Sequence, residues 1–170
     1  LNSIIGFSRV ILKGIDGPVT DLQQQDLSAI YNSGQHLLGL INDILDLSKI
    51  EAGKMELTFD EVDIEKLIKS VMSTVMGLVK DKPVHLEDEI ESNLPPVKAD
   101  SMRIRQILIN LFSNAAKFTD EGTIKVIAKS EGSNVRISVI DSGPGISEED
   151  QEKLFQAFSQ VDASATRATG

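Results

Sequence analysis

A seven-residue apolar repeat in the first third of the chain is the feature that most constrains its fold. Between Thr20 and about residue 51, steps of three and four residues separate the members of one stripe: Leu27, Ile30, Gly34, Leu37, Ile41, Ile44 and Ser48. This spacing places the side chains along one face of an α-helix, as in a coiled coil or a helical bundle. Leu38 and Leu45 widen the stripe, which favours more than two helices around the core.

The preceding residues predict a second helix and therefore a hairpin. Apolar residues between Leu1 and about Lys13 also follow helical spacing, and residues 14–19 supply a connection. Two helices alone cannot bury such wide stripes, so we predict that residues 1–53 dimerise with a second copy as a four-helix bundle. The alternative is that the hairpin packs on the remainder of its own chain.

Residues 54–170 mix strands with helices. Alternating apolar residues predict strands at 54–62, 84–90, 123–130 and 134–140. Asp63, Asp100 and Ser147 suit the N-caps of helices that run to about residues 80, 118 and 158. Helical spacing predicts that Leu78 of the first of these helices, and Ile107 and Leu111 of the second, face the core. We therefore predict an α+β protein, in which an antiparallel helical hairpin is followed by a mixed α/β sandwich.

The charge balance excludes some classes of partner. The formal net charge is −9, and the 17 Lys and Arg residues are scattered, so we expect no nucleic-acid partner and no contact with an anionic membrane. No apolar run approaches the roughly 20 residues that span a bilayer. The absence of cysteine fits a cytoplasmic location. Any membrane anchor of a longer parent protein would lie outside this sequence.

One predicted helix carries three polar side chains that suit the binding of a metal ion and phosphate. At about 100° per residue, Asn110, Asn114 and Lys117 fall within about 60° of one another on the predicted helix 101–118. Amide oxygens can hold Mg²⁺, a hard cation that binds phosphates, and a lysine adds a point charge for them. The alternative is a solvated polar face.

A second candidate follows the strand 134–140. Asp141 ends the strand, and Gly143 and Gly145 follow at the spacing of a tight turn, before Ile146. The carboxylate of Asp141 can accept a hydrogen bond from a ligand amino group, and the glycines allow the backbone to approach a flat ring or a phosphate. The alternative is a plain strand-to-helix turn. The sequence has no phosphate loop of the G-x-x-x-x-G-K-[ST] type and no protein-kinase catalytic loop.

In order along the chain, four segments together resemble the sensor histidine kinases, whose ATPase fold is shared with Hsp90, gyrase and MutL. Residues 47–53 are similar to the end of the family's second dimerisation helix. Residues 110–119 resemble its N box, residues 141–146 its G1 box, and residues 155–158 its F box. The resemblance implies a histidine-kinase/Hsp90-like ATPase sandwich over residues 54–170.

The resemblance also implies that ATP and Mg²⁺ are cofactors, held in part by the helix 101–118. Asn114 would be the principal Mg²⁺ ligand, with Asn110 beside it. Lys117 would touch phosphate, and Phe118 would lie at the adenine side of the pocket.

Further roles are implied for the turn and the residues after it. Asp141 would bind the adenine amino group, and Gly143, Gly145 and Ile146 would shape the adenine floor. Phe155 and Phe158 would begin a lid over ATP; the alternative is that they are ordinary core residues.

By the same resemblance, the γ-phosphate would pass to a histidine and then to an aspartate of a response-regulator receiver domain, a partner that would dock on the bundle.

Relatives that hydrolyse ATP carry a Glu where Asn110 stands, and an asparagine cannot serve as a general base. The acceptor histidine is expected just upstream of Leu1, and we interpret His36 and His85 as structural or exposed. We therefore expect this chain to be a longer parent protein cut at both ends, without the glycine-rich end of the lid and without the last strand and helix of the ATPase fold. We also expect that this chain does not autophosphorylate. Two rival functions are an ATPase of the Hsp90 or MutL type and a degenerate kinase that serves as a dimeric scaffold.

Overall fold

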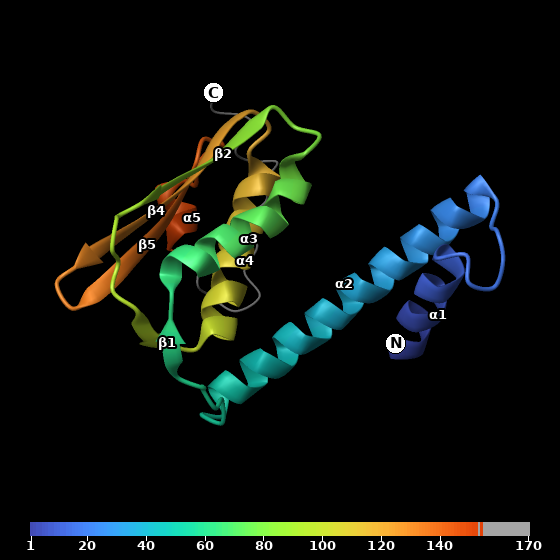
Figure 1. The fold of residues 1–170 in the computed structure, drawn as a ribbon, viewed down its shortest axis with the longest axis horizontal. Coiled ribbons are helices and arrows are strands. Elements are labelled where there is room, and N and C mark those ends of the chain that lie inside the picture. Colours follow the sequence, from blue (N-terminus) through green and yellow to red (C-terminus); the bar gives the residue numbers. More distant parts are fainter. Residues whose placement is uncertain (153, 155–170) are drawn as a thin grey trace. The chain divides into compact units, whose positions relative to one another are not determined.

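The computed structural model describes residues 1–152 and 154. These residues form two compact units, Leu1–Leu57 and the described residues from Thr58 onward. The first unit is helical, and the second combines helices with strands, as predicted (Figure 1).

The first unit is an antiparallel hairpin of α1 (Asn2–Leu12) and α2 (Asp21–Glu51) (Figure 1). A capping box begins α2: the Gln23 N–H donates to Thr20 Oγ1 (3.3 Å), and the Thr20 N–H donates to Gln23 Oε1 (2.9 Å). Gly53, with a φ of +63°, follows the last turn of α2. The two helices pack closely because Gly34 has no side chain; a Cβ there would lie 2.9 Å from Ile5 Cγ1.

The second unit contains five strands and three helices among its described residues. In chain order these are β1 (Asp60–Val62), α3 (Ile64–Val79), β2 (Val84–Ile90), β3 (Val97–Ala99), α4 (Ser101–Phe118), β4 (Gly122–Glu131), β5 (Asn134–Asp141) and α5 (Glu148–Gln151). The main sheet has the order β2-β4-β5, with β2 parallel and β5 antiparallel to β4. A small antiparallel pair joins β1 to β3.

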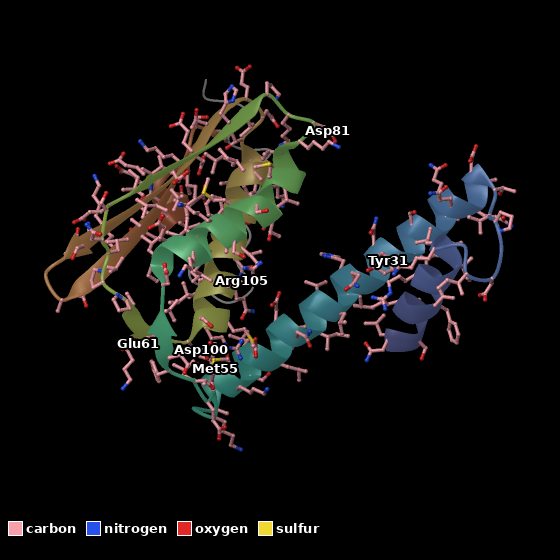
Figure 2. The ribbon with its side chains drawn as sticks, viewed as in Figure 1. Tyr31, Met55, Glu61, Asp81, Asp100 and Arg105 are labelled. Atoms are coloured by element: carbon pink, nitrogen blue, oxygen red, sulfur yellow. The ribbon has the colours of Figure 1, made fainter. Side chains whose placement is uncertain are left out.

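The core lies between this sheet and the helices α3 and α4, which cover one of its faces (Figure 1). Its largest fully buried side chains are Ile68, Val71 and Val75 of α3, Phe112 of α4, and Ile124 and Val126 of β4, together with Thr119. Arg105 of α4 fastens the two helices to each other, because its guanidinium donates to Ser70 Oγ (2.8 Å) and Thr74 Oγ1 (3.2 Å) of α3 (Figure 2).

Asp100 fixes the start of α4. Its Oδ1 accepts hydrogen bonds from the N–H groups of Met102 and Arg103, and its Oδ2 accepts from the Thr58 N–H at 3.1 Å. The backbone donor of Thr58, followed by that of Arg103, lowers the pKa of this carboxyl group. The predicted caps Asp63 and Ser147 also accept backbone hydrogen bonds at the starts of α3 and α5.

Some details of the sequence prediction were wrong. The strand expected at 54–62 is limited to Asp60–Val62, and Leu57 and Phe59 just before it are exposed. Its partner β3, which the sequence did not predict, follows Pro95 and Pro96 and offers only three residues for pairing. On α3, Val79 is buried in place of Leu78. On α4, Ile107 and Leu111 were expected on the core face but are exposed, because the buried stripe is centred on Leu108, Phe112, Ala115 and Ala116. The helix expected to reach residue 158 ends at Gln151 within the described residues.

Candidate functional site

Along α4, the side that faces away from the core is polar on one edge and apolar on the other. Asn110, Asn114 and Lys117 form the polar edge, and all three are exposed. The apolar edge consists of Ile107, Leu111 and Phe118, which are 58%, 46% and 40% exposed. We call these six residues the α4 stripe. Such a surface offers amide oxygens and a cation directly beside an apolar area, which suits a ligand with a charged end and a flat apolar end.

The turn after β5, residues 141–146, contacts the C-terminal end of α4. The Gly143 N–H donates to Asp141 Oδ1 (2.9 Å), which folds the turn back on the end of the strand. A Cβ on Gly143 would lie 2.8 Å from that oxygen and 3.0 Å from the carbonyl oxygen of Phe118. Only glycine fits there without displacing its neighbours. The structure thus brings Asp141 and Gly143 to the helical turn that bears Lys117 and Phe118.

Ser142 ties this turn to the start of β4. Its hydroxyl accepts from the Thr123 N–H (2.9 Å) and donates to the carbonyl of Glu121 (3.2 Å), and its own N–H donates to the Thr123 carbonyl (3.1 Å). Gly122 has a φ of +108°, and a Cβ there would collide with the Ser142 side chain. Sequence reasoning missed both Ser142 and Gly122; the glycine immediately before a strand was the only signal available.

The rest of the turn leads into α5. Gly145 has a φ of +75°, which a residue with a side chain rarely adopts. Ile146 is 44% exposed, and its carbonyl accepts a hydrogen bond from Gln151 Nε2 (3.0 Å). Phe155 and Phe158, expected to begin a lid, lie outside the described residues.

The side chains in this region have the chemistry that a magnesium nucleotide requires. Asn110 and Asn114 are exposed on one side of α4, and their amide oxygens are of the kind that Mg²⁺ accepts as ligands. Lys117 Nζ lies 5.0 Å from the Phe118 ring centroid, so a cation and an aromatic face stand side by side. The exposed carboxylate of Asp141 supplies an acceptor on the neighbouring turn. This set of groups fits the ligand.

Comparison with known proteins identifies both units. Residues 1–53 match the His Kinase A (phospho-acceptor) domain, and residues 99–170 match the family described as histidine kinase-, DNA gyrase B- and HSP90-like ATPase. The catalytic domain of the histidine kinase ThkA is 36% identical, with a TM-score of 0.58, and the match covers 62% of this chain and 71% of that one. The chain belongs to the sensor histidine kinase family.

Other histidine kinases match over nearly the whole chain. The circadian input-output histidine kinase CikA of Synechococcus elongatus is 41% identical over 173 residues, which cover 100% of this chain and 23% of CikA. Full-length ShkA in complex with AMPPNP is 34% identical with a TM-score of 0.78, covering 94% of this chain and 34% of that one. ThkA in complex with the response regulator TrrA is 28% identical with a TM-score of 0.65, covering 92% and 48%.

These matches confirm the predicted family and fold, a helical hairpin followed by a mixed α/β ATPase domain. ATP binding and two-component signalling come with the family. The chain spans about a fifth of the length of the curated histidine kinases that it matches, as with 23% of CikA and 19% of BarA from Escherichia coli. Within residues 1–152 and 154, no helix combines the length and apolar character needed to cross a bilayer. The roles of individual residues in the α4 stripe and the turn 141–146 stay predictions.

Proposed function

We propose that this chain is the dimerising and ATP-binding core of a kinase that transfers the γ-phosphate of ATP to a histidine and then to an aspartate of a receiver domain. The main support for the proposal is the packing of Gly143 against the Phe118 carbonyl, because this contact places the Asp141 turn next to the α4 stripe. Neither segment alone distinguishes a ligand site from a solvated surface.

In this proposal each side chain has a separate task. Asn114, with Asn110 beside it, would hold Mg²⁺, and Lys117 would offset the charge of the phosphates. Asp141 would accept a hydrogen bond from the adenine amino group. Phe118 would lie at the adenine side of the pocket and exclude water from the ring, with Gly143, Gly145 and Ile146 as the floor. ATP·Mg²⁺, when bound, supplies the phosphoryl group and the charge that neutralises it during transfer.

Calorimetric titration with Mg·ADP tests these roles. We expect Asn114→Ala and Asp141→Asn each to weaken binding at least about tenfold, because the first removes a ligand of Mg²⁺ and the second replaces a charged hydrogen-bond acceptor by a neutral amide. Asn134→Ala is the matched control, because Asn134 is exposed at the far end of β5 from Asp141. Unchanged affinity in both site variants would refute the assignment. A wild-type chain that binds no nucleotide would support the scaffold alternative.

The asparagine at position 110 favours phosphotransfer over hydrolysis. An attacking water must lose a proton to a general base, whereas a neutral imidazole already presents a lone pair. The asparagine side chain cannot accept that proton. We therefore expect negligible steady release of phosphate from ATP by this chain, measured with a coupled phosphate assay. Sustained turnover would favour the ATPase alternative.

The apolar face of the hairpin supports self-association. Ile30, Leu37, Ile41 and Ile44 are between 41% and 56% exposed on the single chain. An open groove of about 390 Å³ lies beside them, lined by residues of both α1 and α2: Leu1, Ile4, Ala29, Ile30, Ser33, Gly34 and Leu37. We propose that a second copy covers this face as a four-helix bundle. Sedimentation should show a dimer at micromolar concentration. Ile41→Lys should give a monomer. Leu22→Lys is the control and should stay a dimer, because Leu22 is exposed and lies outside the stripe.

The receiver partner is inferred from ThkA, whose structure contains the response regulator TrrA. We propose that a receiver domain docks on the hairpin of this chain. His36 and His85 are both exposed, on α2 and β2, and we assign neither as the phosphate acceptor. Acid-labile phosphate on either residue after incubation with Mg·ATP would overturn that assignment. The cytoplasmic location suggested by the absence of cysteine also stays a prediction.

A further inference from the structure

We infer that Lys82 is a positioning residue for the nucleotide site, because it holds the C-terminal turn of α4 in place. Lys82 follows Asp81 in the turn between α3 and β2 (Figure 2). Its Nζ donates to the carbonyl oxygens of Ala116 (2.8 Å) and Thr119 (3.0 Å). The inference rests on the proposed function, since it concerns the geometry of the same site.

The two carbonyls need a donor from elsewhere in the chain. The chain leaves the helix at Thr119, with φ −98° and ψ 115°, so no N–H of a following helical turn bonds the carbonyls of Ala116 and Thr119. Ala116 and Thr119 are 4% and 0% exposed, which limits access of water to them. The ammonium group of Lys82 satisfies both carbonyls, and its charge favours the negative end of the helix dipole.

Other groups at this position do little to fix the turn. Lys82 Nζ also lies 3.4 Å from Asp120 Oδ1, but that carboxylate is 88% exposed, and an ion pair with such a group is weak. The hydroxyl of Thr119 is buried, and within the described residues it has no hydrogen-bond partner. The polar anchoring of the end of α4 therefore depends on the contacts of Lys82 with the two carbonyls.

The anchored turn belongs to the proposed site. It carries Lys117 and Phe118, and the Phe118 carbonyl is the atom against which Gly143 packs. Next to Lys82, the Pro83 carbonyl accepts from the Gly122 N–H (3.0 Å), at the start of the strand to which Ser142 is tied. One short segment, residues 82–83, thus contacts the end of α4 directly and is linked to the Asp141 turn through the start of β4. Without the ammonium group, the end of α4 would be free to shift relative to the Asp141 turn.

The test compares three substitutions in the full 170-residue chain with a control. In Lys82→Met the side chain keeps its length and loses the donors, and we expect Mg·ADP affinity to fall by about tenfold or more, the usual effect of weakening one contact to a charged ligand. Lys82→Arg keeps a charged donor and should recover most of that loss. Lys80→Met is the control, since Lys80 is exposed in the same turn. Asp120→Asn should bind as the wild type does, because the ion pair is not the anchor.

Amide hydrogen exchange of the ligand-free protein separates positioning from loss of the fold. In Lys82→Met we expect faster exchange of the Thr119 and Gly122 amides, with the Val71 amide in the middle of α3 unchanged. Equal affinity and equal exchange in Lys82→Met and the wild type would overturn the inference. If Lys82→Met does not fold, Lys82→Gln, which keeps one donor group, is compared in the same way. If the wild type itself binds no nucleotide, the proposed function fails, and the exchange rates still decide whether Lys82 anchors the helix.

Discussion

Substituting Gly122 by alanine should destabilise the second unit, through backbone strain and through the loss of two hydrogen bonds. The backbone at Gly122 has a φ of +108°, and holding a residue with a Cβ there costs about 1–3 kcal/mol. The new Cβ would also lie 3.2 Å from Ser142 Cβ and closer still to its hydroxyl. Ser142 would have to rotate and release the Thr123 N–H and the Glu121 carbonyl, at about 1 kcal/mol each. The sum is about 3–5 kcal/mol, a large part of the 5–15 kcal/mol typical of a domain.

Hydrogen exchange of the buried β4 amides, such as that of Val126, measures this loss. A destabilisation of about 4 kcal/mol accelerates exchange about 1,000-fold when it proceeds through unfolding, since about 1.4 kcal/mol corresponds to a factor of ten. Gly132→Ala is the control, because Gly132 has a φ of +62° and a Cβ added there would meet nothing within 4 Å, so it should cost only about 1–2 kcal/mol. Equal effects of the two alanines would refute the claim that contact with Ser142 is what requires glycine at position 122.

Other contacts lead to three more predictions. Gly34→Val should lower the thermal stability of the hairpin in circular dichroism, because its side chain would overlap that of Ile5, whereas Gly39→Val has open space and should lower it less. Gly143→Ala should weaken Mg·ADP binding at least about tenfold while the fold persists, since its Cβ would push the turn away from the end of α4; normal affinity would contradict the close packing. Hydrogen bonds from Lys125, and next from Lys129, lower the pKa of Glu89 from 4.5 to about 2. The ion pairs therefore stabilise the fold fully above pH 4.5, and this stabilisation is lost as the pH falls through 2. The stability difference between wild type and Glu89→Gln should shrink over that interval, and a constant difference would exclude this cause.

Features that depend on neighbouring residues were predictable from the sequence. The N-caps at Thr20, Asp63 and Asp100 lie within three residues of the N–H groups that they accept from, so their side-chain chemistry is decided locally. Helical spacing likewise predicted the hairpin and α4. The polar edge of the α4 stripe, and Asp141 with the two glycines that follow it, were identified because each group occupies one short segment.

Features that depend on contacts between distant segments were not predictable in this way. Lys82 is 34 and 37 residues from the carbonyls that it binds, and Ser142 is 19 residues from the Thr123 N–H. A lysine after a helix and a serine in a turn are ordinary on their own. The exposure of Ile107 and Leu111 also depends on how α4 is rotated against the sheet, which the breadth of an apolar stripe does not specify.

In the proposed site, the α4 stripe and the Asp141 turn bind one nucleotide between them. An amide NMR titration of the chain with Mg·AMPPNP, repeated with paramagnetic Mn²⁺ in place of Mg²⁺, tests this arrangement. We expect shifts at both Asn114 and Gly143 in the first titration, and in the second we expect severe broadening at Asn110 and Asn114 with less at Asp141, which lies toward the adenine. Shifts confined to one of the two segments, or metal broadening centred elsewhere in the unit, would contradict the claim.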